Sequence, residues 1–337
     1  MTNFIIIVFL TLILFQISYQ LGLKFKLLDK PSDRKIHKIP TPYTGGLGLI
    51  LTYFLVVKLL FFELIVLQII FTSFFIFIIG FLDDKYNINI STRLLFQIFI
   101  IYFFINNNNL EINYIFNLNE KFELSLGGFN IIFTVLCVAL FLNSCNYIDG
   151  IDGLLTLQTI FIFSSIIFLQ LFFYKTFNLE LFFLIIPLII FLLVNFNIFN
   201  FPKLFLGNGG SAMLGFIISF IIIYYSYYDD LNIDGELIIW SVSFIVYEFI
   251  STTISRILRK KPIFNSGHDH IHYILKNKFN SILSVNLTIF ILNILFILTG
   301  FFAWLHSDIL SVVIFVFLFF VYFIIREKLL KIYFTDI

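Results

Sequence analysis

Acidic and basic side chains in this sequence gather in short segments between long apolar runs. Asp83 and Asp84 directly follow an apolar run that ends at Leu82. Carboxylates at the edge of an apolar helix usually face a cavity or an ion, although adjacent acids are also common at solvated helix ends. Arg93 and Gln97 follow one helical turn apart and can reach the same face. This segment therefore offers paired carboxylates beside a cation.

A second segment combines Asx side chains with glycine. Residues 143–154 read NSCNYIDGIDGL, with Asn143 and Asn146 three apart, then Asp149 and Asp152 three apart and each followed by glycine. This spacing aligns polar groups on one helix face and lets the backbone turn tightly afterwards. The structural alternative is two turns that cap a helix.

Residues 205–211 read FLGNGGS and open another apolar run. Free backbone N–H groups at such a helix start, from Gly207 to Ser211, can hold an anion. A tight turn between helices would explain the same glycines.

Two segments are rich in cations. Residues 29–46 read DKPSDRKIHKIPTPYTGG, where prolines and glycines impose a turn while Lys35 and His37 present hydrogen-bond donors. Residues 268–273 read HDHIHY and follow a basic stretch. The three histidines suggest zinc, but no cysteine or glutamate nearby in the loop completes a familiar zinc site. Diphosphate binding is the more economical interpretation, and an exposed basic loop is the structural alternative.

The elements between these segments are predicted to be membrane spans. The chain is 60% hydrophobic and 12% charged, with a mean hydropathy of +1.03, which excludes a soluble domain. A helix needs about 20 apolar residues to cross the hydrocarbon core. Eleven runs come near that length: 4–22, 46–62, 64–82, 93–105, 129–147, 154–174, 180–199, 212–228, 237–255, 281–303 and 309–325. We expect an all-α polytopic membrane protein with a single domain, 1–337.

Basic residues separate sharply between alternate loops. Of the 21 Lys and Arg residues, only Lys58, Lys121 and Lys175 fall on one side. The positive-inside rule makes the other side cytoplasmic, so the N-terminus is expected outside and the C-terminus inside. All the polar segments described above then face the cytoplasm. Residues 110–126 alternate polar and apolar residues and predict a small external β-hairpin. The net charge of +1 gives no indication of a nucleic-acid partner.

Carboxylates, amides, cations and glycines are thus predicted on one membrane face. Oxygen ligands suit Mg²⁺, and Arg, Lys and His suit phosphates. The combination predicts a magnesium site that holds a nucleotide diphosphate.

In their order along the chain, from residues 29–46 to residues 268–273, the segments resemble the polyprenyl-phosphate N-acetylhexosamine-1-phosphate transferases of glycosyltransferase family 4, which include the peptidoglycan phospho-MurNAc-pentapeptide transferase. The resemblance runs from about residue 29 to 275 and also includes GFLDDKYNINISTRLLFQ. The branch that it resembles most contains the undecaprenyl-phosphate GlcNAc-1-phosphate enzymes. It implies transfer of HexNAc-1-phosphate from a UDP-sugar to undecaprenyl phosphate, with release of UMP. The resemblance further implies Mg²⁺ as cofactor, with Mn²⁺ as a substitute. It also implies that the reaction is the first step in the synthesis of a surface glycan, such as O-antigen or capsule, at the bacterial inner membrane.

The resemblance makes Asp83 and Asp84 the catalytic pair, with Asp83 nearer the lipid phosphate. It makes Asp84, Asp149 and Asn208 the metal ligands. The segments and the resemblance together predict these substrate-binding residues: Lys35, His37, Arg93, Asn146, Asp152, Gly207, Ser211, His270 and His272.

Two departures from the family pattern bear on activity. Asn208 stands where the family normally has a magnesium-binding Asp, which keeps a carbonyl oxygen but removes one negative charge. Tyr273 replaces the last His of the usual HxHH pattern. A catalytically weakened member is therefore kept as an alternative to an active one.

Two rival functions predict different sequence features. A transporter or lipid flippase predicts polar residues near span midpoints, whereas acids and histidines here concentrate at the cytoplasmic ends and mid-span polar residues are mostly Ser, Thr, Gln or Asn. A CDP-alcohol phosphotransferase needs Ala-Arg soon after its first Asp-Gly, which Leu154-Leu155-Thr156 does not supply. The sequence leaves open which sugar is transferred and whether the chain forms a homodimer.

Overall fold

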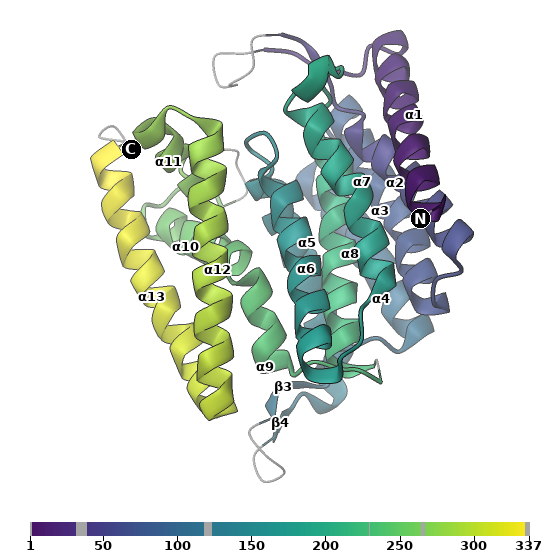
Figure 1. The fold of residues 1–337 in the computed structure, drawn as a ribbon. Helices are drawn as coiled ribbons and strands as arrows, with labels where there is room; N and C mark the ends of the chain where they lie inside the picture. Colours follow the sequence, from purple (N-terminus) through teal and green to yellow (C-terminus); the bar gives the residue numbers. More distant parts are fainter. Residues whose placement is uncertain (1, 32–38, 118–122, 229, 264–266, 334–337) are drawn as a thin grey trace. The chain divides into compact units, whose positions relative to one another are not determined.

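The computed structural model describes residues 2–31, 39–117, 123–228, 230–263 and 267–333, and it is mainly helical (Figure 1). The helices are α1 (Thr2–Lys24), α2 (Gly45–Leu60), α3 (Leu64–Tyr86), α4 (Ile90–Asn108), α5 (Asn130–Ile148), α6 (Leu154–Tyr174), α7 (Leu179–Asn195), α8 (Gly207–Tyr227), α9 (Gly235–Ile238), α10 (Ser243–Leu258), α11 (Ile271–Phe279), α12 (Ile282–His306) and α13 (Asp308–Tyr333). Short 3₁₀ turns lie at Gly127–Phe129, Ile198–Asn200 and Ile239–Val242. The strands are β1 (Leu28–Asp29), β2 (Thr41–Pro42), β3 (Tyr114–Asn117) and β4 (Glu123–Ser125).

Within the described residues, nine helical segments are long and apolar enough to cross a membrane. This is a multi-pass membrane protein. The predicted spans 46–62 and 180–199 coincide with α2 and α7, which are apolar but have only 16 and 17 residues. At about 1.5 Å per residue they reach about 24 to 26 Å, short of the hydrocarbon core of about 30 Å. α2 stops at Phe61, whose φ of 52° is left-handed and cannot continue a helix. The count of eleven spans stays a prediction.

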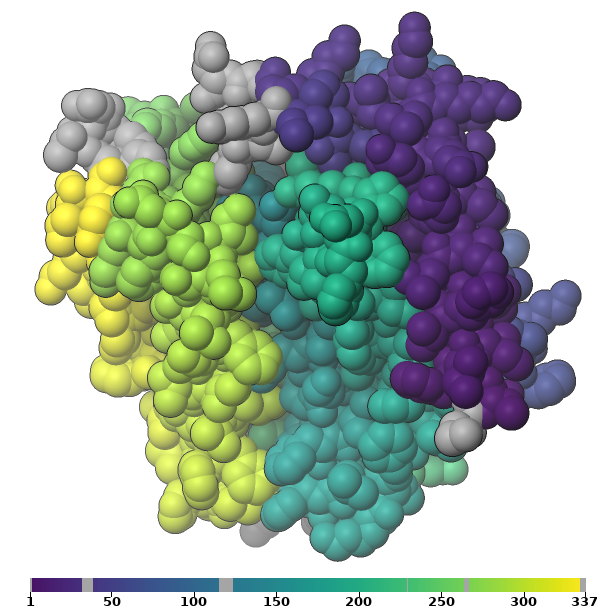
Figure 2. All heavy atoms as spheres, turned by 45° about the horizontal axis from the view of Figure 1, so that its top comes forward, coloured from purple at the N-terminus to yellow at the C-terminus, as the bar shows by residue number. Residues whose placement is uncertain are grey.

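The chain forms two compact units. Unit 1 comprises Met1–Leu110 and Thr134–Ile221, and unit 2 comprises Glu111–Phe133 and Ile222–Ile337. The expectation of a single domain stays a prediction. In unit 1, α1 packs along α2 and α7, and α6 packs along α7. Two reciprocal hydrogen bonds, from the Ser18 hydroxyl to the Thr44 carbonyl and from the Thr44 hydroxyl to the Ser18 carbonyl, fix the start of α2 against α1. Figure 2 shows α1, in purple, on the surface of the molecule; its outer side exposes large apolar side chains such as Phe9, as expected of a helix facing lipid.

Helices α3 and α8 touch backbone to backbone. A Cβ atom added to Gly80 of α3 would lie 2.6 Å from the carbonyl oxygen of Asn208 and from the backbone of Gly209. A Cβ on Gly209 would lie 2.8 Å from the carbonyl oxygen of Phe77. Only glycine allows this approach, which brings the C-terminal end of α3 to the N-terminal end of α8.

Unit 2 is built around α10, which packs against α12 and α13. Trp240 is fully buried, lies against Gly300 of α12, and donates its indole N–H to the Ser311 hydroxyl of α13 at 2.9 Å. Strands β3 and β4 pair antiparallel within the segment 110–126, with Tyr114 opposite Ser125. The membrane side of this hairpin stays a prediction.

We predict that Gly80→Ala lowers the thermal midpoint of the protein in detergent, because the added methyl group overpacks the α3–α8 contact at a cost of about 1 to 3 kcal/mol. Gly128→Ala is the matched control, since a Cβ there meets nothing within 4 Å. Fluorescence-detected size-exclusion chromatography after heating measures both midpoints. Equal midpoints for the two variants would contradict the close approach.

Candidate functional site

The carboxylate of Asp83 is held by two donors in unit 1. Asp83 lies in the last turns of α3 and is only 8% exposed, so its charge needs partners. The Arg93 guanidinium donates through Nη1 to Oδ2 of Asp83 at 2.7 Å. The side-chain amide of Asn208 donates to the same oxygen at 3.2 Å. Arg93 also donates through Nη2 to Oδ1 of Asn143 at 3.3 Å. Residues from α3, α4 and α8 thus meet at one carboxylate, and Asn143 of α5 is joined to it through Arg93.

Asp84 faces the N-terminal turn of α8. The backbone N–H of Gly209 donates to Oδ2 of Asp84 at 3.4 Å. Gly207 has a φ of +77°, and a Cβ there would lie 2.9 Å from the same oxygen and 2.7 Å from the carbonyl oxygen of Tyr43. Glycine is therefore required at position 207 both for the turn and for the approach of Asp84. Contact between a carboxylate and a helix N-terminus is favourable because the helix dipole is positive there.

Two further aspartates lie in the turn between α5 and α6. Burial, and then the charges of Asp152 and Asp84, raise the pKa of Asp149 well above its usual value. Asp152 forms an ion pair of 2.6 Å with the Lys203 ammonium group. Lys203 in turn lies over the ring of Phe205, 5.2 Å from its centroid. The electrostatic coupling of Asp149 to Asp84 joins this turn to the end of α3.

The donor set fits a magnesium ion. Asp84, Asp149 and Asn208 offer two carboxylates and an amide carbonyl, and Mg²⁺ is commonly held by one or two carboxylates together with water and substrate phosphates. Burial, and then the charges of Asp152 and Asp84, raise the pKa of Asp149, and a cation at this place would offset those two charges. No group of three His, Cys, Asp or Glu side chains within the described ranges is close enough to hold a metal ion by itself. A metal here therefore needs Asn208, water or substrate oxygens to complete its shell.

The other predicted residues of unit 1 have more local contacts. Ser211 is fully buried and donates to the carbonyl oxygen of Asn208 at 3.2 Å, so it stabilises the first turn of α8. Asn146 is partly buried in the last turn of α5. Their roles in substrate binding stay predictions. Lys35 and His37 lie outside the described residues.

The histidine segment belongs to unit 2. His270 is buried, and its Nδ1 lies 3.3 Å from Oε1 of Glu248. His272 is fully buried, and neither ring nitrogen has a hydrogen-bond partner among the described residues. Burial, and then the charge of His270, lower the pKa of His272 to about 3, so its imidazole is neutral at physiological pH. Tyr273 stacks on the exposed ring of His268 with centroids 4.6 Å apart.

Sequence reasoning missed three residues that form these contacts: Lys203, Glu248 and Arg326. Asn143 was part of the predicted Asx segment but had no assigned role, and it is a partner of Arg93. Lys203 is the partner of Asp152, and its position four residues before Gly207 was the available signal. Glu248 lies inside the predicted span 237–255, where an acid is rare and marks a functional or paired site. Its partner Arg326 lies beyond the predicted end of the last span.

Comparison with known proteins supports the family resemblance of the polar segments. Residues 66–226 match the profile of glycosyl transferase family 4. This stretch contains Asp83, Asp84, Asp149, Asp152 and Asn208, whereas the histidine segment lies outside it.

Three relatives illustrate the similarity. One, from Bacillus subtilis, is named "Probable undecaprenyl-phosphate N-acetylglucosaminyl 1-phosphate transferase" and is 26% identical over 277 residues, which cover 80% of this chain and 75% of the relative. Undecaprenyl-phosphate alpha-N-acetylglucosaminyl 1-phosphate transferases from Escherichia coli and Thermotoga maritima are 24% and 26% identical, over 80% and 76% of this chain and 74% and 75% of their own lengths. The profile match over residues 66–226, these relatives and the ordered motifs agree that the chain is similar to glycosyl transferase family 4.

Proposed function

We propose that this protein transfers a HexNAc-1-phosphate group from a UDP-sugar to undecaprenyl phosphate or a similar polyprenyl phosphate. The products are polyprenyl-diphospho-HexNAc and UMP. The observation that carries the proposal is the cluster around Asp83 and Asp84, in which two carboxylates at the end of an apolar helix meet a guanidinium, an amide and a glycine-rich helix N-terminus. The family and the names of the relatives support the same reaction class.

The chemical step joins two phosphates. An oxygen of the lipid phosphate attacks the β-phosphorus of the donor, a new P–O bond forms, and the bond from the β-phosphorus to the bridging oxygen breaks as UMP leaves. A phosphate monoester has a second pKa of about 6 and is already largely ionised at neutral pH, so no strong base is required. Both donors to Asp83 contact Oδ2, and the Arg93 charge makes this carboxylate a poor nucleophile. We therefore favour direct attack by the lipid phosphate, with Asp83 as the group that positions it.

A bound Mg²⁺ would supply positive charge that offsets the negative charge on the diphosphate and the departing UMP. Asp84, Asp149 and Asn208 are the residues that would hold it, because they combine carboxylate and carbonyl oxygens. Mn²⁺ would suit the same ligands. Asp152, which Lys203 already neutralises, is assigned to the nucleotide rather than to the metal.

The remaining assignments follow the resemblance. His270 and His272 are proposed to contact the donor diphosphate, and Lys35 and His37 to close on the nucleotide. The distribution of basic residues supports an active site that faces the cytoplasm of a bacterial inner membrane. The donor is proposed to be UDP-GlcNAc or a modified HexNAc, for a surface glycan such as lipopolysaccharide O-antigen, capsule or cell-wall polymer.

The transporter alternative gains one observation, because Glu248 is an acid inside an apolar helix. However, Glu248 is paired with Arg326 and contacts four other groups, namely the Thr252 and Tyr322 hydroxyls, the Ile271 N–H and the His270 ring. This is a fixed structural arrangement and not a residue poised to carry an ion. The phosphotransferase proposal also accounts for the cluster in unit 1, which a transporter leaves unexplained.

The direct test is release of UMP by purified protein in detergent, supplied with undecaprenyl phosphate, Mg²⁺ and a panel of UDP-HexNAc donors. We expect release that requires both the lipid and the metal, and the donor that supports it identifies the sugar. Folded protein that releases no UMP with any donor would contradict the proposed activity.

Asp83→Asn and Asp84→Asn should each lower turnover by at least about 100-fold, a typical cost of removing one charged group that acts in the transition state. Asp230→Asn, at an exposed position outside the cluster, is the control and should retain activity. Full turnover by Asp83→Asn would reject the assignment of the catalytic pair.

Asn208→Asp places a carboxylate beside Asp83, where the wild-type amide donates a hydrogen bond. We expect a lower thermal midpoint in EDTA, because like charges repel by about 1 to 4 kcal/mol at such separations. Mg²⁺ should restore the midpoint and act at a concentration about tenfold lower than in wild type, since 1.4 kcal/mol corresponds to a factor of ten. A midpoint that does not respond to Mg²⁺ would remove Asn208 from the metal site.

A further inference from the structure

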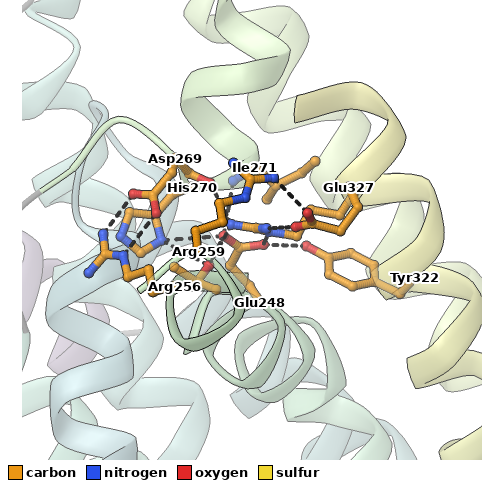
Figure 3. Close-up of polar contacts among 10 residues, drawn as sticks. Glu248, Arg256, Arg259, Asp269, His270, Ile271, Tyr322 and Glu327 are labelled. Carbon is orange, nitrogen blue, oxygen red and sulfur yellow. Dashed lines mark hydrogen bonds and ion pairs between the residues drawn. The ribbon is translucent and has the colours of Figure 1, made fainter. Parts of the chain in front are cut away.

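Unit 2 contains a buried network of charged and polar side chains that joins α10, α13 and the segment leading into α11 (Figure 3). Glu248 of α10 lies at its centre and is only 1% exposed. Its Oε2 accepts a hydrogen bond from the Tyr322 hydroxyl at 2.6 Å. Its Oε1 accepts from the Thr252 hydroxyl at 2.9 Å and from the backbone N–H of Ile271 at 3.0 Å. The same Oε1 lies 3.3 Å from Nδ1 of His270.

Arg326 of α13 is the counter-charge and is fully buried. Its Nε lies 3.4 Å from Oε2 of Glu248. Its Nη2 donates to the Thr252 hydroxyl at 2.9 Å and to the carbonyl oxygen of Asp269. One guanidinium therefore neutralises Glu248 and also holds the backbone directly before His270.

A second arginine holds the side chain of Asp269. Arg256 donates through Nε and Nη2 to the two carboxylate oxygens at 2.8 and 2.6 Å, and through Nη1 to the carbonyl oxygen of Ile263 at 2.6 Å. Burial works to raise the pKa of Asp269, but the hydrogen bonds from Arg256 hold it below its usual value. The carboxylate stays ionised, and this bidentate contact stays formed, at all pH values above the ordinary range of an aspartate.

These contacts bracket one residue. Arg326 holds the carbonyl of Asp269 and Glu248 holds the N–H of Ile271, so the peptide groups on both sides of His270 are fixed. Beside Arg326 the Glu248 carboxylate is ionised and can only accept hydrogen bonds. The Nδ1 atom of His270 must then carry the proton in their contact. The network sets the backbone position of His270 and the protonation of one ring nitrogen together.

His272 depends on the same support. Its ring is parallel to that of His270, with centroids 5.5 Å apart and an angle of 3° between the planes. Both of its ring nitrogens are buried without a partner among the described residues. An unsatisfied buried polar group costs about 1 to 3 kcal/mol, which a hydrogen-bonding ligand would offset.

Stability alone does not explain this network. Buried ion pairs lose much of their attraction to desolvation, and apolar replacements are often neutral or stabilising. One contact of Glu248 and one of Arg326 go instead to the backbone of the four-residue segment from Asp269 to His272, which carries two histidines. Fixing such a segment before binding reduces the entropy lost when a ligand orders it.

We propose that Glu248 and Arg326 are positioning residues, which hold the segment from Asp269 to His272 in the geometry that binds the donor diphosphate. The inference rests on the proposed function, because that function gives the histidines their ligand. Neither residue touches the reacting atoms in this scheme, since both act through the backbone and the ring of His270.

The test is Glu248→Gln, assayed for UMP release at varied donor and varied lipid concentrations. The KM for the UDP-sugar should rise at least tenfold, with kcat/KM for the donor lower on the order of 100-fold, as small misplacements of binding groups produce. The KM for polyprenyl phosphate should stay within about twofold of wild type. A merely structural defect lowers the active fraction and leaves both KM values unchanged.

Arg326→Lys is the second variant, because it keeps a positive charge beside Glu248 and removes the fork that reaches Thr252 and Asp269. Arg326→Lys should reproduce the rise in donor KM. If Glu248→Gln does not fold, Arg326→Lys provides the test in its place. Lys278→Gln is the matched control, since it removes an exposed cation in the last turn of α11, whereas Arg259 shares Glu327 with Arg326 and is not independent of the network. The donor KM of Lys278→Gln should match wild type.

Hydrogen exchange of the Ile271 amide gives a readout that does not depend on activity. Exchange should be faster in Glu248→Gln and unchanged in Lys278→Gln. Donor KM or Ile271 exchange equal to wild type in Glu248→Gln would overturn the positioning role. Absence of UMP release by wild-type protein would instead contradict the proposed function, and the exchange measurement would still decide whether Glu248 holds the segment.

Discussion

The constraint on which this structure depends is the presence of a buried carboxylate at the end of an apolar helix. Asp83 can remain charged there only because Arg93 and Asn208 donate to it. Those donors come from α4 and α8, so the ends of three helices must converge before the charge is tolerated. The glycine contact between α3 and α8 makes that convergence sterically feasible. Packing and electrostatics thus specify the same geometry, which leaves Asp84 facing a helix N-terminus.

The same constraint is met differently in unit 2. Glu248 is buried deeper than Asp83 and is neutralised by an arginine from another helix, Arg326. In unit 1 the paired charges lie beside further acids and a helix N-terminus, an arrangement suited to phosphates and a cation. In unit 2 the paired charges form hydrogen bonds with the backbone of the segment from Asp269 to His272, an arrangement suited to holding two imidazoles in place. The groups around each buried carboxylate thus indicate its role: phosphate and cation binding in the cluster around Asp83, and positioning of the histidine segment for Glu248.

The sequence predicted the helical membrane architecture and the segments that carry chemistry, because apolar run length and clustered polar residues are local signals. It predicted the Asp83–Asp84 pair together with Arg93 for the same reason. It could not predict the ends of α2 and α7, since both lie in apolar runs that continue past the helix. It also missed Lys203 and Arg326, whose partners are 51 and 78 residues distant in sequence (Asp152 and Glu248) and are matched only by tertiary packing.

The central claim is that phosphorus moves with the sugar, which separates sugar-1-phosphate transfer from simple glycosyl transfer. The most direct measurement is a single-turnover reaction with a UDP-HexNAc donor radiolabelled in the β-phosphate, followed by separation of lipid from nucleotide. The account predicts that label enters the lipid fraction in step with UMP release. Label that remains in the nucleotide as UDP, while sugar appears on the lipid, would contradict it.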